Sequence, residues 1–241
     1  MDELYFAMGA LFLASCLQGI IGFGAGMLSM SLLTLFWPVA YSTAVLNPLG
    51  LVVSSSLVWR QRRDISLTEI KPLISGLPFG VFIGLMALTH LSDRYLKLML
   101  GVTLFIAVLN ALWRGTRSTA LPMVYAWLAG FFSGICGVSV SSAGPPTLIY
   151  ATIAGWDKTL FRANLSAFFL SASTLACLGL ASKGLLTTET LKVTAYFIPI
   201  GLIGSKLGFH LGQRVPQTLF TRFTLALLTI LALRFIVMSF T

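Results

Sequence analysis

The sequence predicts an all-α polytopic membrane protein made of two inverted repeats, each a broken glycine-rich hairpin followed by three transmembrane helices. The chain of 241 residues is 57% hydrophobic and 10% charged, with a mean hydropathy of +0.92. This composition leaves too little polar surface to coat a soluble core. A glycine motif breaks an apolar stretch in each half of the chain. We expect one membrane domain over 1–241, with a first repeat over 1–117 and a second over 118–241.

The first element is an apolar stretch over 4–37 that is too long for one crossing. A helix of about 34 residues would run to about 50 Å, against about 30 Å of hydrocarbon. The motif Gly-Ile-Ile-Gly-Phe-Gly-Ala-Gly interrupts it at 19–26. We predict a hairpin with a first arm over 4–22, a glycine tip, and a shorter second arm over 26–37 that ends before Pro38.

Three apolar segments of about 20 residues follow, and each is long enough to cross the hydrocarbon as one helix. We place these spans over 40–59, 72–90 and 95–113.

The stretch over 121–155 again exceeds one crossing, and it carries Gly-Ile-Cys-Gly-Val-Ser-Val-Ser at 134–141. It predicts a second hairpin, with arms over 121–138 and 142–155. Pro145 and Pro146 fit the opening turn of the second arm, where a helix does not need the N–H. Three further spans complete the prediction, over 159–181, 190–210 and 217–238.

Several blocks recur in the same order in the two halves of the chain. The pairs are Gly19 with Gly134, Gly22 with Gly137, Asn47 with Asn164, Ser54 with Ser171, Ser56 with Ser173, Lys71 with Lys192, and Pro78–Gly80 with Pro199–Gly201. A hairpin returns the chain to the side it left, so the three crossings that follow turn the second repeat upside down.

Charge placement favours this inversion. With the N-terminus outside, ten basic residues fall on the inner side: Arg60, Arg62, Arg63, Lys71, Arg114, Arg117, Lys158, Arg162, Arg214 and Arg222. Four fall outside: Arg94, Lys97, Lys183 and Lys192. If each hairpin were a single crossing, the split would be close to even, and the positive-inside rule favours the uneven one. We expect a multi-pass protein of the cell inner membrane with both termini outside.

The polar groups of the predicted core suit an anion. All seven acidic residues lie at the N-terminus or in predicted loops, so no carboxylate is available for a core cation site or a buried proton relay. A half-helix that begins inside the membrane directs its free N–H groups and positive end into the cavity. The predicted substrate-binding residues are Gly22, Gly24, Gly26, Asn47, Ser139, Ser141, Ser142, Arg162 and Asn164.

Some of these residues also have a packing interpretation. Gly19 and Gly134 fit close contacts between helices, and Asn47 and Asn164 can tie helices together instead of binding a ligand. His90 and His210 leave proton coupling open. The net charge of +9 follows from loop charges, so we expect no nucleic-acid partner. We also expect neither a metal ion nor another cofactor.

The paired motifs, the Asn-bearing spans and the Pro-Gly spans resemble the TauE/SafE family of sulfite exporter-like permeases. The resemblance covers essentially the whole chain, and its specific part is the motif at 19–26. In the second copy, Ser139 and Ser141 stand where Gly24 and Gly26 stand in the first. The resemblance implies transport of small sulfur-containing or organic anions, such as sulfite or sulfonates, across a bacterial inner membrane.

We therefore expect a secondary transporter rather than an enzyme. It would bind a small anion at a central site, work by alternating access in the lipid bilayer, and act as an exporter. The alternatives are a non-transporting membrane scaffold or assembly protein, and a membrane thiol-relay protein using Cys16 and Cys136. The sequence leaves the oligomeric state open.

Overall fold

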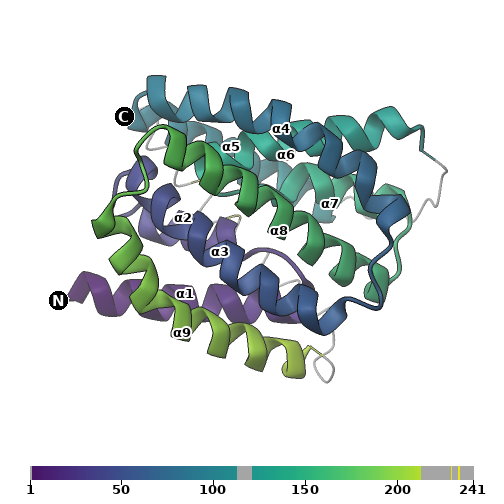
Figure 1. The fold of residues 1–241 in the computed structure, drawn as a ribbon, viewed down its shortest axis with the longest axis horizontal. Coiled ribbons are helices and arrows are strands. Elements are labelled where there is room, and N and C mark those ends of the chain that lie inside the picture. The colour runs from purple at the N-terminus through teal and green to yellow at the C-terminus, as the bar shows by residue number, and fades with distance from the viewer. Residues whose placement is uncertain (1, 113–120, 213–228, 230–232, 234–241) are drawn as a thin grey trace.

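The computed structural model describes residues 2–112, 121–212, 229 and 233. Within this part of the chain the secondary structure is helical, without strands, and the helices lie roughly along the long dimension of the molecule (Figure 1). The helices are α1 (Asp2–Ile21), α2 (Ala25–Leu33), α3 (Val39–Gln61), α4 (Leu67–His90), α5 (Asp93–Leu112), α6 (Met123–Val140), α7 (Gly144–Ile153), α8 (Lys158–Ser182) and α9 (Thr188–Leu211). The predicted all-α class is confirmed.

Several helices are suited to a lipid bilayer. Among the described residues, α3, α4, α6 and α8 are long and apolar enough to cross a membrane. Helix α5 covers residues 95–112 of the predicted span 95–113, and α9 covers the predicted span 190–210. The predicted span 217–238 lies outside the described residues, apart from two isolated positions.

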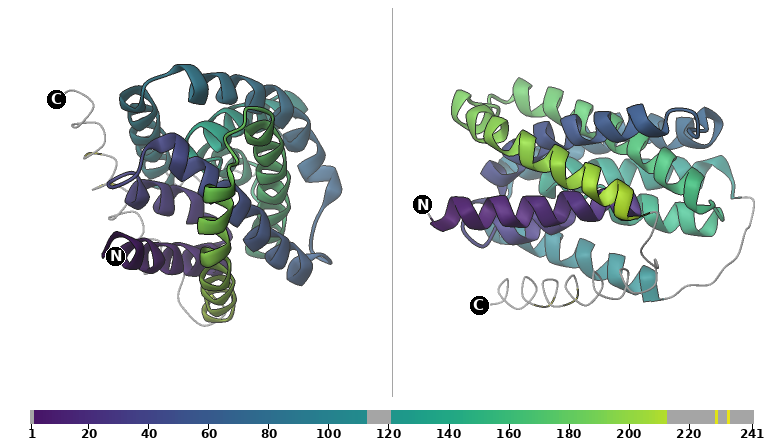
Figure 2. Two further views of the ribbon diagram at one scale, coloured as in Figure 1. Left: turned by 60° about the vertical axis from the view of Figure 1, so that its left-hand side comes forward. Right: turned by 90° about the horizontal axis from the view of Figure 1, so that it is seen from below.

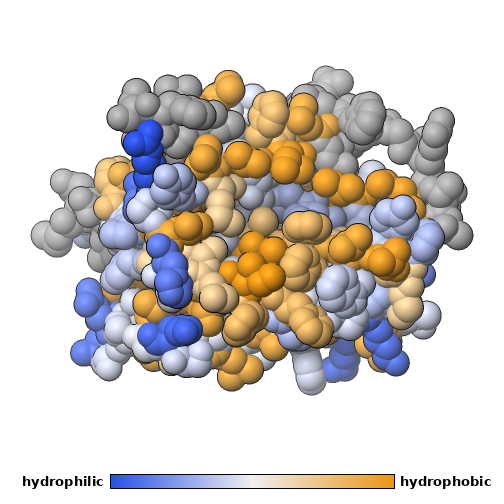
Figure 3. All heavy atoms as spheres, turned by 90° about the horizontal axis from the view of Figure 1, so that it is seen from above, coloured by the Kyte–Doolittle hydropathy of each residue, from blue (hydrophilic) through white to orange (hydrophobic). Residues whose placement is uncertain are grey.

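Large apolar side chains cover much of the outer surface. Phe79 and Phe82 of α4 are 60% and 67% exposed, and hydrophobic residues occupy much of the middle of the face in Figure 3. A soluble protein of this size rarely exposes so large an apolar surface. This surface and the long apolar helices are those of a multi-pass membrane protein.

The first hairpin breaks at its glycines, as its motif predicts. Helix α1 ends at Ile21, and Gly22 and Gly24 have φ angles of 97° and 102°, which favour glycine because it has no Cβ. The short arm α2 ends at Leu33, before the predicted end at 37. The Thr34 hydroxyl donates to the Met30 carbonyl at 2.7 Å, and a turn follows before α3.

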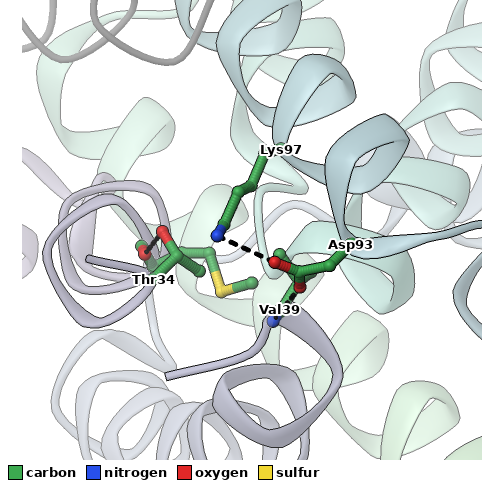
Figure 4. A network of polar contacts seen from close by, with 5 residues as sticks. Thr34, Val39, Asp93 and Lys97 are labelled. Carbon is green, nitrogen blue, oxygen red and sulfur yellow. Dashed lines mark hydrogen bonds and ion pairs between the residues drawn. The ribbon is translucent and has the colours of Figure 1, made fainter. Parts of the chain in front are cut away.

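The start of α3 is fixed by a side chain from α5. The Val39 N–H donates to the Asp93 carboxylate at 2.7 Å, and Lys97 pairs with the same carboxylate at 2.8 Å (Figure 4). Pro38 therefore precedes a new helix as its N-cap rather than acting only as the end of the arm. An anionic group at a helix N-terminus is favourable because it meets the positive end of the helix dipole.

The second hairpin breaks at Ser141, which has a φ angle of 49°. Helix α6 ends at Val140, and α7 begins at Gly144 with prolines in its first turn. This placement agrees with the predicted role of Pro145 and Pro146.

Helices from the two halves of the chain pack against each other. Helix α1 packs against α9, α6 packs against α4, and α3 packs against α8; Figure 2 shows α1 beside α9 in its second view. Each hairpin is thus covered by a long helix from the other half.

Glycine contacts set the register of these interfaces. A Cβ added at Gly80 would fall on the Phe131 carbonyl, and one at Gly208 would fall on the Cys16 carbonyl. Phe131 and Cys16 each stand three residues before the first glycine of a hairpin motif. The structural counterpart of Gly80 is therefore Gly208, about two turns beyond the Gly201 that the sequence match selects. The match between Gly80 and Gly208 rests on their equivalent backbone contacts, whereas the match with Gly201 rests on the position of the neighbouring prolines.

Candidate functional site

A central cavity lies between the two hairpin tips, with a volume of about 80 Å³. That space is enough for several water molecules or one small oxyanion. Both hairpins, α3 and α8 form its wall, and the lining residues near the tips are Gly24, Ala25, Gly26, Met27, Asn47, Ser141, Ser142, Ala143 and Gly144.

The first tip presents backbone to the cavity. A Cβ added at Gly24 would meet nothing within 4 Å, so this residue borders open space. The first N–H groups of α2, from Ala25 onward, have no partner within the helix. They carry the positive end of the helix dipole. This end of the cavity can therefore receive a negatively charged oxygen.

The second tip presents hydroxyl groups. Asn47 of α3 donates from Nδ2 to the Ser141 Oγ at 3.2 Å and to the Thr43 carbonyl at 3.0 Å, which orients both side chains at the cavity wall. Ser142 also lines the cavity; it is 1% exposed, and its hydroxyl has no hydrogen-bond partner. Because buried polar groups are nearly always paired, this hydroxyl indicates a place for a ligand or a water molecule.

The two tips touch each other directly. A Cβ at Gly26 would fall on the Ser141 carbonyl, and one at Gly144 would lie 3.3 Å from the Met27 sulfur. The beginnings of α2 and α7 are thereby held next to one cavity rather than at two separate sites.

Carbonyls at the ends of the long arms accept hydrogen bonds close to the tips. Arg162 Nη2 donates to the Gly19 carbonyl near the end of α1 at 2.7 Å. At the end of α6, the Ser139 carbonyl lies 3.4 Å from the Thr43 hydroxyl that donates to it, and the Ser142 N–H donates to the Cys136 carbonyl at 3.0 Å. These donors pair with carbonyls at the ends of α1 and α6.

Five of the nine predicted site residues line the cavity: Gly24, Gly26, Asn47, Ser141 and Ser142. The structure does not bring the other four to its wall. Gly22 packs against the Arg162 backbone, and Ser139 donates to the Ile135 carbonyl. Arg162 lies over the Phe209 ring, 4.9 Å from its centroid.

The two repeat-related asparagines occupy different environments. Asn164 is fully buried, accepts from the Ser66 N–H at 2.9 Å and has no partner for its Nδ2. Asn47 has the Ser141 hydroxyl as a partner, but the counterpart of Ser141 is Gly26, which has no side chain. This Ser-to-Gly difference makes the site asymmetric.

The cavity also contains polar residues that the sequence prediction omitted: Ser15, Gln18, Ser29, Ser54 and Ser173. The Gln18 amide donates to the Ser54 hydroxyl at 3.4 Å. Gln18 directly precedes the first glycine of its motif. A polar amide at that position in an apolar arm could have identified it as a site residue from the sequence. Serines are weaker signals because their hydroxyls often bond their own helix.

The lining residues contain no ionisable side chain, and the described part of the chain holds no cluster of side chains suited to a metal ion. The cysteines lie in separate interfaces. Cys16 contacts Gly208 of α9, whereas Cys136 lies 3.7 Å from the Thr103 hydroxyl of α5.

Two broken hairpins around a central cavity in a polytopic helical membrane protein are features that many secondary transporters share. The chain matches the family model described as sulfite exporter TauE/SafE over residues 7–235. It therefore belongs to the TauE/SafE family, as its motifs indicated. No match was found among curated proteins or among solved structures.

Proposed function

We propose that this protein is a secondary transporter that exports small sulfur-containing anions, such as sulfite or sulfonates, across the cell inner membrane. The family assignment supports this class of substrate. The observation that carries the proposal is the unpartnered Ser142 hydroxyl in a cavity that two half-helix N-termini border. Such a cavity supplies hydrogen-bond donors without a carboxylate to repel an anion.

The cavity-lining members of the predicted site bind the substrate. The backbone at Gly24 and Gly26 admits an oxygen close to the start of α2, while Asn47 orients the Ser141 hydroxyl and Ser142 donates its own. Gly22, Ser139, Arg162 and Asn164 hold the tips and the flanking helices in place.

Alternating access follows from two inverted repeats, 1–117 and 118–241. The packing of the two halves against each other supports this division, since α1 packs on α9 as α6 packs on α4. In such a protein the two halves can adopt mirror-related arrangements, and each opens the same site to one side of the membrane.

The membrane potential supplies a driving force for export. A negative cell interior favours the exit of one negative charge by about 2.3 kcal/mol per 100 mV. A proton-coupled mechanism is the alternative for energy coupling, with His90 and His210 as the titratable candidates; both are exposed at the ends of their helices.

Transport is tested by reconstituting the full chain in liposomes loaded with sulfite or an alkanesulfonate. We expect saturable efflux that accelerates when a potassium gradient with valinomycin makes the sulfite-loaded side negative. The Ser142→Ala variant should lose most of the flux, and Ser139→Ala, from the same hairpin, is the matched control. Absence of saturable flux and of ligand-dependent thermal stabilisation would favour the scaffold alternative.

A further inference from the structure

We propose that Gln18 and Ser54 form a second polar end of the central cavity, which binds a hydroxyl group of the substrate. This inference rests on the proposed transport function and names the substrate class: small sulfonates that carry a hydroxyl on the second carbon from the sulfur. It is carried by the position of these two residues in the cavity wall, two helix turns along α3 from Asn47.

One face of α3 runs along the cavity. Asn47, Gly50 and Ser54 line the wall, because residues three, four and seven positions apart share a face of a helix. Asn47 holds the Ser141 hydroxyl of the second tip at 3.2 Å. Ser54 lies about 10 Å farther along the helix and accepts a hydrogen bond from the Gln18 amide. The cavity therefore has polar groups at two levels.

Gly50 leaves the space between the two levels open. Outside the backbone of its own helix, a Cβ added at Gly50 would have a single neighbour within 4 Å among the described residues, the Ser173 hydroxyl of α8 at 3.1 Å. Ser173 also lines the cavity, and its hydroxyl makes no hydrogen bond with another group of the described chain. A ligand can therefore extend past Gly50 from one polar level to the other.

The pair of Gln18 and Ser54 retains hydrogen-bonding capacity. The two residues are 6% and 1% exposed, and their hydrogen bond of 3.4 Å is a long one. The Ser15 hydroxyl, one turn before Gln18 in the same wall, has no hydrogen-bond partner within the described chain. Buried polar groups are nearly always paired. A ligand hydroxyl fits here, because it can donate to the Gln18 amide oxygen and accept from a serine.

The distance between the two levels sets the length of the ligand. If a ligand oxygen forms a hydrogen bond of about 2.8 Å at each level, about 5 Å remain between the two oxygens. Two oxygens on one sulfur atom lie closer together than this. An extended chain of oxygen, sulfur, two carbons and oxygen spans about 5 Å, since each of its bonds is about 1.5 Å long. We therefore infer a ligand of the length of 2-hydroxyethanesulfonate.

The volume of the cavity agrees with this length. Its 80 Å³ corresponds to about five to eight groups of the size of a water molecule. A sulfonate, two carbons and a hydroxyl fit into that space.

Propane-1-sulfonate is the matched probe for the test, because a methyl group stands where 2-hydroxyethanesulfonate has its hydroxyl. The measurement is ligand-dependent thermal stabilisation of the purified full chain. We expect 2-hydroxyethanesulfonate to bind about tenfold more tightly than propane-1-sulfonate, since the methyl group leaves the polar groups of Gln18 and Ser54 unpaired. Sulfite, which is too short to reach Gln18 from the tip, serves as the reference ligand.

Two substitutions test the assignment of the residues. Gln18→Leu and Ser54→Ala should each remove most of the preference for the hydroxylated sulfonate and leave the affinity for sulfite unchanged. Ser54→Ala removes only one hydroxyl, so it keeps the test decisive if Gln18→Leu does not fold. Ser55→Ala is the matched control and should keep the preference, because the exposed Ser55 hydroxyl bonds the Leu51 carbonyl of its own helix at 2.7 Å.

The outcomes separate this inference from the proposed function. A preference for 2-hydroxyethanesulfonate that depends on Gln18 and Ser54 supports both. If the two sulfonates bind equally, or if the preference survives in the folded variants, the second polar end is wrong while binding and transport of sulfite stand. If neither sulfite nor either sulfonate stabilises the protein or is transported in liposomes, both the inference and the proposed function are wrong.

Discussion

Ser139 and Ser142 stand three residues apart in the second hairpin, yet their hydroxyl groups have different environments. The Ser139 hydroxyl donates to the Ile135 carbonyl at 2.6 Å, while that of Ser142 is buried without a partner at the cavity. The first hydroxyl bonds its own helix, and the second has no hydrogen-bond partner within the protein. An unpaired buried hydroxyl destabilises the folded protein, so we expect a ligand that pairs with it to gain affinity.

Replacing Ser142 with alanine separates binding from stability. Because hydrogen bonds to charged groups contribute about 1.5–3 kcal/mol, we expect about 10- to 100-fold weaker anion binding. The free energy of unfolding should stay the same or rise slightly, since no hydrogen bond within the protein is lost. Ligand titrations followed by thermal unfolding measure both quantities. For Ser139→Ala we expect a loss of about 1 kcal/mol of stability and unchanged affinity; equal effects of the two substitutions would contradict the assignment.

Arg162 should show the opposite pattern. Arg162→Met removes the donor of the Gly19 carbonyl, so we expect a loss of about 1–3 kcal/mol of stability and only a small change in ligand affinity. Lys158→Met is a matched control, because Lys158 also donates from α8 to a carbonyl, that of Gly212, at 3.2 Å. Its exposed position predicts a smaller loss. If Arg162→Met abolished binding in a protein that remained folded, Arg162 would belong to the site itself.

At the scale of elements, the long helices approach each other through backbone. The contacts of Gly76, Gly80 and Gly84 with α6 leave no room for a side chain, and Gly204 and Gly208 contact α1 in the same way. Lipid provides no hydrophobic drive between helices, so close packing of small residues carries the association.

A methyl group at one of these glycines should disrupt its interface. Gly80→Ala would place a Cβ against the Phe131 carbonyl, and we expect a loss of about 1–3 kcal/mol in the free energy of unfolding. Gly9 of α1 offers the control, since a Cβ there meets nothing within 4 Å. Gly9→Ala should be neutral or gain up to about 1 kcal/mol from helix propensity. Thermal unfolding in detergent measures both, and a Gly80→Ala protein as stable as the parent would refute this account of the interface.

At the scale of the whole molecule, each half of the chain completes the other. Helix α9 packs against α1 of the first hairpin, α4 packs against α6 of the second, and α3 packs against α8. The cavity is therefore formed jointly, and neither half contains it alone.

Inverted topology predicts that corresponding loops face opposite sides of the membrane. Arg62 follows α3 and Lys183 follows α8, each as the C-cap of its helix. In a background with Cys16, Cys136 and Cys177 replaced by serine, an impermeant thiol reagent should label Lys183→Cys in intact cells. It should label Arg62→Cys only after permeabilisation. Labelling of both positions from the same side would rule out the inverted arrangement.

The sequence by itself determined the membrane class, the two broken hairpins and the family. These properties follow from composition, helix length and glycine motifs, which are local along the chain. Four of the predicted site residues, Gly24, Gly26, Ser141 and Ser142, line the cavity because they lie in or directly after the motifs that mark the tips.

The tertiary structure decided which polar groups face one another. It turned Arg162 toward the Gly19 carbonyl, left the Asn164 Nδ2 without a hydrogen-bond partner, and brought Gln18 to the cavity wall. It also matched Gly80 with Gly208 rather than Gly201. These features depend on the rotation and register of helices distant in sequence, and close backbone contact between the helices sets both.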